Sequence, residues 1–225
     1  MTLSKLNKSI IQCRKCNRLV HFREKIAIEK RRQYFDQDYW GKPITGYGDP
    51  SAKLLMVGLA PAAHGGNRTG RVFTGDKSAD FLFKCLYESG FSNQPLSVNK
   101  NDGLKLNNLY LTTALKCVPP EDKPTSNELK TCLNFFSKEI SSLKNITIIL
   151  ALGKIGHDAC INYYKQHYYI KNKDYQFSHG SKNMLPDKKI LMGSYHPSPR
   201  NVNTGRIDKL KMVNLLKKIK KELED

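Results

Sequence analysis

Four short segments of the sequence are almost purely apolar, and longer segments with a mixed pattern separate them. The apolar runs are "KLLMVGL" (53–59), "NLYLTTALKC" (108–117), "ITIILAL" (146–152) and "KILMGSY" (189–195). None shows the alternation of apolar and polar residues that a strand with one wet face has, so both faces of each are expected to be buried. Such strands are typical of a parallel sheet that is covered on both sides.

The segments between these runs have helical periodicity. Helices are predicted over 77–89, 125–143, 154–165 and 207–223. Gly90 is placed to end the first helix, and Thr125 with Glu128 is spaced as a capping box at the start of the second. The last helix carries apolar residues at Ile207, Leu210, Val213, Leu216 and Ile219. This alternation of strands and helices predicts one α/β domain with three layers over residues 1–225.

Polar loops follow the predicted strands. They cover residues 58–76, 118–125, 153–158 and 196–206. Ligands of open parallel sheets bind beyond the carboxyl ends of the strands, so these loops are expected to form the functional site. The first of them, "GLAPAAHGGNRTGRVFTGD", is far longer than a plain connection of about two to six residues. We therefore expect it to hold a ligand.

The composition is that of a folded globular protein, with 39% hydrophobic residues among 225. No apolar stretch approaches the roughly 18 residues that cross a bilayer, and the first residues lack the apolar core of a signal peptide. These features predict an intracellular, cytoplasmic protein that does not bind a membrane.

Basic residues outnumber acidic ones by a wide margin. Lys and Arg number 38 against 20 Asp and Glu, which gives a formal net charge of +18. The surplus favours a polyanionic partner such as nucleic acid, which would associate the protein with the nucleoid. A lysine-rich background composition is the alternative. The surplus is strongest in residues 1–35, within an expected basic arm over 1–50.

The six cysteines fall into two groups. Cys85 and Cys160 occupy apolar positions of predicted helices, where a buried small hydrophobic residue is expected. The others form C-x2-C and C-x14-C pairs, namely Cys13 with Cys16 and Cys117 with Cys132. Together these four make a candidate metal site, and spacing alone leaves zinc and an iron–sulfur cluster open. The first pair has no second pair nearby, so its partners must come from across the fold.

Two loops carry residues suited to catalysis. Asp76 closes loop 58–76 at a predicted helix start, where an N-cap is the alternative role. His196 heads "HPSPRNVNTGR", in which two prolines stiffen the backbone, and a buried structural histidine is the alternative there. His64 and Arg68 are candidates for cradling phosphate. Loop 58–76 has neither the G-K-[ST] ending of a P-loop nor the G-x-G-x-x-G of a dinucleotide site.

Three segments together resemble the uracil-DNA glycosylase superfamily, and most closely its family 5. "GLAPAAHGGNRTGRVFTGD" resembles the first motif of that family, "HPSPRNVNTGR" its second, and "LTTALKCVPPEDKPT" the segment with the third cysteine. Ala60 stands where related families carry a polar residue. The resemblance implies a three-layer α/β/α sandwich around a four-stranded parallel sheet. It also implies a [4Fe–4S] cluster on Cys13, Cys16, Cys117 and Cys132.

The resemblance further implies an enzyme that flips uracil out of single- or double-stranded DNA and hydrolyses its N-glycosidic bond, acting as a monomer. Asp76 and His196 are then the catalytic residues, and Phe73 stacks on the uracil ring. The other implied substrate-binding residues are Gly58, Ala60, Pro61, His64, Asn67 and Asp122. The implied DNA-binding residues are Arg68, Arg200, Asn201, Asn203 and Arg206.

Three positions depart from the family pattern and leave alternatives open. With Ala60 in place of an acid, Asp76 is either the general base or a purely electrostatic group. Asp122 stands where relatives often carry Asn, and Thr113 where related families carry a uracil-reading Asn. The latter favours acceptance of other deaminated bases, such as hypoxanthine or xanthine. The competing functions are a DNA-binding protein with an iron–sulfur cluster but no catalysis, and an iron–sulfur sensor or electron carrier.

Overall fold

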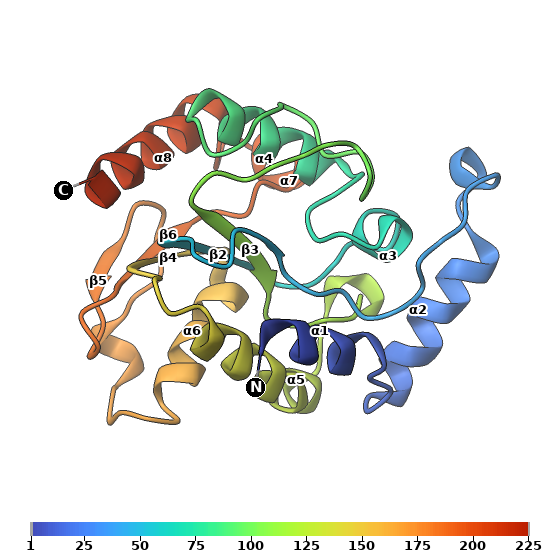
Figure 1. The fold of residues 1–225 in the computed structure, drawn as a ribbon, viewed down its shortest axis with the longest axis horizontal. Coiled ribbons are helices and arrows are strands. Elements are labelled where there is room, and N and C mark those ends of the chain that lie inside the picture. The colour runs from blue at the N-terminus through green and yellow to red at the C-terminus, as the bar shows by residue number, and fades with distance from the viewer. Residues whose placement is uncertain (1, 225) are drawn as a thin grey trace.

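The computed structural model describes residues 2–224 and is built around one twisted sheet (Figure 1). Its strand order is β1-β3-β2-β4-β6-β5. The four central strands run parallel and are β2 (Leu54–Gly58), β3 (Leu109–Thr113), β4 (Ile148–Leu152) and β6 (Ile190–Ser194). They coincide with the four predicted runs. The short edge strands β1 (Tyr47–Gly48) and β5 (Lys182–Met184) pair antiparallel, so the sheet has six strands instead of the predicted four.

Helices cover both faces of this sheet, which confirms the three-layer prediction (Figure 1). The face above the sheet in this view carries α4 (Lys77–Glu88), α7 (Pro199–Asn203) and α8 (Lys209–Glu224). The face below carries α1 (Leu3–Ile11), α5 (Ser126–Ser142) and α6 (Lys154–Tyr164). Two more helices, α2 (Asn17–Glu29) and α3 (Gly66–Thr69), lie to one side of the sheet. Among residues 2–224, no helix is both long and apolar enough to span a bilayer.

The two-sided cover explains the unbroken apolar runs. In β2, Leu54 and Met56 belong to the core below α4 and α8, whereas Leu55 and Val57 belong to the core above α5 and α6. All residues of β2 are buried. Burying a side chain of this size contributes roughly 1.5–3 kcal/mol, so both cores favour the same register of the strand.

Local signals set the helix ends as expected. The Thr125 hydroxyl accepts from the Glu128 N–H at 3.2 Å, and the Glu128 carboxylate accepts from the Thr125 N–H at 2.8 Å, which confirms the capping box of α5. Gly90 follows α4 with φ +76°, a conformation that suits glycine. The expected burial of Cys85 and Cys160 is also confirmed.

One of the five apolar residues named for the last predicted helix lies outside the core. Leu210 is 70% exposed, although Ile207, Val213, Leu216 and Ile219 are buried. A series at every third residue drifts by about 60° around a helix with each step, so it leaves the buried face at one end. Met212 and Leu223 lie on the face that packs inward and take part in the core of α4 and α8.

Candidate active site and cysteine pocket

The parallel strands end along one edge of the sheet. Gly58 at the end of β2 is in register with Thr113 of β3, and Leu152 at the end of β4 is in register with Ser194 of β6. The loops predicted to carry function leave from this edge: residues 59–76 after β2, 114–125 after β3, and 195–206 after β6.

The Phe73 ring lies directly on the end of β2. A Cβ added to Gly58 would come within 2.6 Å of Phe73 Cζ, so only glycine leaves room for the ring there. Phe73 has φ +48°, an uncommon conformation for a residue with a bulky side chain. The backbone is thus held in a strained state that aims this aromatic ring at the edge of the sheet.

Asp76 caps α4 and also faces loop 58–76. Its Oδ1 atom accepts from the Ser78 and Ala79 N–H groups at 2.9 and 3.0 Å. Its Oδ2 atom lies against Gly65, where an added Cβ would be only 2.0 Å away. Burial raises the pKa of Asp76, and the two backbone N–H groups oppose that rise. One carboxylate oxygen is therefore bound to the helix start, and the other is directed at the glycines of the loop.

His196 follows β6 and packs beside the start of α6. A Cβ at Gly153, the N-cap residue of α6, would lie 3.4 Å from His196 Cβ. Burial lowers the pKa of His196 to about 4, so its imidazole is neutral near pH 7. The Asn201 side-chain amide donates to the His196 carbonyl at 2.9 Å and fixes this turn. A neutral imidazole offers one donor and one acceptor to a ligand.

A buried ion pair fixes the middle of loop 58–76. Arg71 donates to both carboxylate oxygens of Asp102, at 2.9 and 2.7 Å. It also donates to the hydroxyls of Thr74 and Ser97, at 2.9 and 2.8 Å. The side chains of the pair are only 4% and 10% exposed. Three of these hydrogen bonds therefore attach the segment next to Phe73 to residues 97–102, and the fourth, to Thr74, stays within the loop.

Asn67 and Arg68 are both buried and hydrogen-bonded inside the protein. Asn67 is 1% exposed, and its side-chain amide donates to the Arg23 carbonyl at 3.1 Å. Arg68 is 9% exposed and donates to the His64 and Gly75 carbonyls, both at 2.7 Å. It also donates to Gln37 Oε1 at 2.6 Å, and its guanidinium lies over the Tyr34 ring. Both side chains are occupied inside the protein because they hold α3 in place.

The remaining substrate-binding candidates of loop 58–76 differ in how far they are buried. His64 is half-buried, and its Nδ1 atom is 3.0 Å from the Tyr39 hydroxyl. Burial lowers the pKa of His64, as do the nearby charges of Arg31 and Arg68. Pro61 is buried, and Ala60 packs against the cluster around Leu19, Leu115 and Cys132.

The expected DNA-contacting residues after β6 are mostly exposed. Arg200, Asn203 and Arg206 are on the surface of α7 and the turn that follows it, and Arg206 lies over the Tyr195 ring. Asp122 is exposed too, and both it and Glu121 have positive φ, at +56° and +54°. Two such residues in succession make a strained turn beyond β3.

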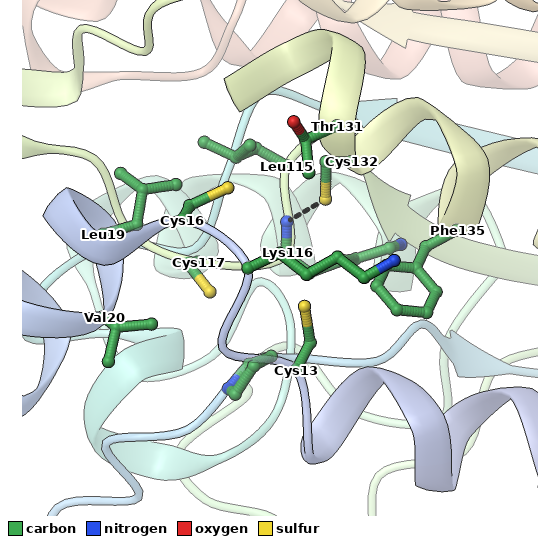
Figure 2. Close-up of a pocket in the computed structure, with 12 residues that line it drawn as sticks. Cys13, Cys16, Leu19, Val20, Leu115, Lys116, Cys117, Thr131, Cys132 and Phe135 are labelled. Atoms are coloured by element: carbon green, nitrogen blue, oxygen red, sulfur yellow. Dashed lines mark hydrogen bonds between the residues drawn. The ribbon is translucent and has the colours of Figure 1, made fainter. Parts of the chain in front are cut away.

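All four cysteines predicted to bind metal line one small pocket (Figure 2). Cys13 and Cys16 lie between α1 and α2, Cys117 follows β3, and Cys132 is on α5. Figure 2 shows the Sγ atoms of Cys13 and Cys132 pointing toward one another across this pocket. Its other lining side chains are Lys15, Leu19, Val20, Pro43, Leu115, Lys116, Thr131 and Phe135. The fold thus brings together thiols that are up to 119 positions apart in the sequence.

The surroundings of the thiols are largely apolar. Burial raises the pKa of Cys117 to about 12 and that of Cys132 to about 11. The Lys116 N–H donates to Cys132 Sγ at 3.3 Å, while the Lys116 ammonium points away to a buried ion pair with Glu139 at 2.6 Å. Within residues 2–224, no three His, Cys, Asp or Glu side chains are close enough to hold a single metal ion.

Two features of the site were not found from the sequence. The Arg71–Asp102 pair joins residues 31 positions apart, and no local pattern marks such a partner. Trp40, the one tryptophan of the chain, packs against Gly70 of loop 58–76. The sequence did offer one signal for Trp40, because it is the single tryptophan and stands in a segment rich in aromatic and basic residues.

The chain is similar in sequence to known proteins over most of its length. A sequence profile of the Uracil DNA glycosylase superfamily matches residues 45–224. A Type-5 uracil-DNA glycosylase of Thermus thermophilus is 39% identical over 214 residues, which is 95% of each chain. One of Pyrobaculum aerophilum is 40% identical over 198 residues, 88% of this chain and 83% of the relative. A Type-4 uracil-DNA glycosylase of Archaeoglobus fulgidus is 22% identical over 202 residues. The protein thus belongs to the uracil DNA glycosylase superfamily, and within it to the type-5 branch.

Proposed function

We propose that this protein excises uracil from DNA by hydrolysis of the N-glycosidic bond, and that Phe73, Asp76 and His196 carry the reaction. One observation carries the assignment of residues. Phe73 lies on Gly58 at the end of β2, and His196 lies against Gly153 just beyond the neighbouring strand β4. An aromatic face and a neutral imidazole thus meet the same edge of the sheet, as a flipped base requires.

Excision begins with uracil rotated out of the duplex, because its glycosidic bond cannot be reached within the base stack. The base stacks on the Phe73 ring. As the bond breaks, the electron pair passes to uracil, and negative charge develops on its O2 atom. His196 donates a hydrogen bond to that oxygen. Since its pKa is lowered to about 4, the imidazole acts as a neutral donor and keeps its proton.

Asp76 supplies negative charge near the sugar, which becomes an oxocarbenium ion. Its Oδ2 atom is the one available to the substrate, because Oδ1 is bound by two N–H groups of α4. A water molecule held by Oδ2 would attack C1′ and give up one proton, which ends on the uracil anion, so the products are an abasic site and neutral uracil. Those two hydrogen bonds also favour the ionised carboxylate against the opposing effect of burial.

DNA contacts come from exposed basic and polar residues of the loop after β6. The exposed side chains of Arg200 and Asn203 extend from α7, and that of Arg206 extends from the turn after it. The formal charge of +18 supports binding to the phosphate backbone of single- or double-stranded DNA. The protein would act as a monomer associated with the nucleoid through this DNA.

Cys13, Cys16, Cys117 and Cys132 would hold a [4Fe–4S] cluster. The fit rests on four thiols that line one apolar pocket and on the backbone N–H that donates to Cys132 Sγ. Such N–H groups stabilise thiolate sulfur. Thiolate bonds from these four residues would tie the α1–α2 turn to the turn after β3 and to α5, and so would hold the N-terminal arm on the sheet.

The range of bases would be broader than uracil. Thr113 is 2% exposed, and its hydroxyl donates to the Leu115 carbonyl at 2.9 Å. The hydroxyl proton is therefore not available to a carbonyl of uracil, and this loss of one uracil-reading donor supports acceptance of hypoxanthine and xanthine as well. Excision of these bases from otherwise identical oligonucleotides measures the range directly.

The proposal is tested by single-turnover excision on a uracil-containing oligonucleotide, followed by alkaline cleavage of the abasic site. His196→Ala is expected to slow excision by about 10²–10³, since it removes one donor that acts mainly in the transition state. Asp76→Asn keeps the size of the side chain and also slows excision. Exposed His167→Ala and Asp36→Asn are the matched controls and retain the wild-type rate.

Two results would contradict the proposal. No excision by the wild-type protein, with DNA binding retained, would favour the non-catalytic DNA-binding alternative. Wild-type rates in both His196→Ala and Asp76→Asn would place the active residues elsewhere, with His64 and Asp122 the next candidates.

A further inference from the structure

Two lysines converge on one tryptophan at the rim of loop 58–76. The ammonium of Lys42 lies 5.4 Å from the centre of the Trp40 ring, and that of Lys100 lies 5.3 Å from it. They come from chain segments on opposite sides of loop 58–76 in the sequence, and both are exposed. We call Lys42 and Lys100 the Trp40 lysine pair.

The indole is fixed to loop 58–76. A Cβ at Gly70 would meet three ring atoms of Trp40 at 3.2 to 3.4 Å, so the ring packs on the Gly70 backbone. The Trp40 N–H donates to the Arg68 carbonyl at 2.9 Å, and the indole Nε1 donates to the Pro43 carbonyl at 3.1 Å. Trp40 therefore has one position relative to the loop that carries Phe73 and Asp76.

The second lysine is also held in place. The Gly75 N–H donates to the Ser97 carbonyl at 2.8 Å, which joins the Lys100 segment to loop 58–76. The Asp102 carboxylate accepts from the Val98 and Asn99 N–H groups at 2.8 and 3.2 Å. Through its ion pair with Arg71, Asp102 fixes both segments together. Lys100 therefore extends from an ordered turn.

The pair carries two positive charges without a negative one. No carboxylate of residues 2–224 forms an ion pair with either ammonium. The face of the indole attracts each ammonium, while the two like charges repel each other. An anion near both ammonium groups removes that repulsion. The arrangement favours a ligand with negative charge at the rim of the loop.

We propose that the Trp40 lysine pair binds the phosphate backbone of the DNA strand beside the flipped nucleotide. Successive phosphates of one strand are 3.4 Å apart along the helix axis, and the two ammonium groups lie within about 11 Å of each other, so one strand reaches both. The Trp40 ring that both ammonium groups face packs on the Gly70 backbone within loop 58–76, and both lysine side chains are exposed. This inference rests on the proposed function, because it takes loop 58–76 to be the base-binding loop.

The test measures the affinity of the full-length protein for a uracil-free duplex at several salt concentrations. Each phosphate contact contributes about 0.9 to the slope of log K against log salt, so Lys42→Ala/Lys100→Ala should reduce its magnitude by about 1 to 2. Lys42→Arg/Lys100→Arg keeps the charges and should restore the slope. Lys218→Ala/Lys221→Ala removes two exposed lysines of α8 and is the matched control.

A slope equal to that of the wild type in Lys42→Ala/Lys100→Ala overturns the inference. So does an equal reduction in the α8 control, because the effect would then come from total charge. Uracil excision by the wild-type protein is measured in parallel. Its absence would contradict the proposed function, whereas excision with an unchanged slope would contradict only the phosphate site.

Discussion

The ion pair between Arg71 and Asp102 makes loop 58–76 sensitive to a single buried carboxylate. Asp102→Asn removes the charge and keeps the size of the side chain. The Asp102 carboxylate accepts two hydrogen bonds from Arg71 and others from the N–H groups of Val98, Asn99 and Leu104. An amide offers only one oxygen to these donors and leaves the Arg71 charge buried without a counterion.

The size of the effect follows from the pKa of Asp102. Arg71 and the backbone N–H groups overcome the effect of burial and lower this pKa from 3.8 to about 2. Each pKa unit corresponds to about 1.4 kcal/mol, so the ionised carboxylate stabilises the folded state by about 2–3 kcal/mol at pH 7. Because the folded-state pKa is the lower one, this contribution is complete above pH 4 and is lost as the pH falls toward 2.

Urea unfolding at pH 7 measures the loss directly. Asp102→Asn should lower the free energy of unfolding by about 2–3 kcal/mol, which shifts the midpoint by about 1 M for a slope near 2–3 kcal/mol/M. The control is Glu121→Gln, which breaks an ion pair with Lys123 whose side chains are 76% and 79% exposed. It should cost less than about 1 kcal/mol.

The difference between Asp102→Asn and the wild type should also shrink between pH 4 and pH 3. In single-turnover excision, Asp102→Asn should be slower than the wild type, because Phe73 is two residues from the loosened Arg71. A loss in Asp102→Asn no larger than in Glu121→Gln, or one that does not change with pH, would refute this reasoning.

Three more predictions follow from the same geometry. Because burial lowers the pKa of His196 to about 4, the single-turnover rate should show no inflection near pH 6.5, and a fall centred there would contradict a neutral His196. Gly65→Ala places a Cβ 2.0 Å from Asp76 Oδ2 and so must displace the carboxylate. It should slow excision as Asp76→Asn does, and it should lower the melting temperature because the cap of α4 is lost. A wild-type rate of excision would show that Oδ2 is not used. Cys117→Ser should lose iron, visible absorbance and thermal stability, whereas Cys160→Ser at a buried site outside the pocket should keep its iron; equal iron in both would exclude Cys117 as a ligand.

The layered core could be predicted from the sequence because its signals are local. Apolar runs without alternation predicted β2, β3, β4 and β6, and the Thr125–Glu128 spacing predicted the start of α5. Each signal lies within a few residues and depends on burial or on one helix turn. The edge strands β1 and β5 were missed because they have two and three residues, too few to show a period.

In the candidate site, too, local signals could be predicted from the sequence and long-range contacts could not. Asp76, His196 and the four metal-binding candidates stand in recognisable motifs, so their residue types and spacing selected them before any fold was known. Motif membership did not distinguish outward from inward side chains. Asn67 and Arg68 lie in the same loop as Phe73, yet their polar groups are bound to Arg23, His64 and Gly75.

The sequence by itself determined the fold class, the family and the residues suited to catalysis, because these depend on hydrophobic period and on motifs within short segments. Only the tertiary structure decided which polar groups are free to meet a ligand. Asp102 neutralises the charge of Arg71. Lys42 and Lys100 both face the Trp40 ring, and neither forms an ion pair with a carboxylate of residues 2–224. Long-range packing sets the partners of a side chain. An arginine or lysine can therefore be buried in an ion pair that holds the fold, or be exposed and able to contact a phosphate.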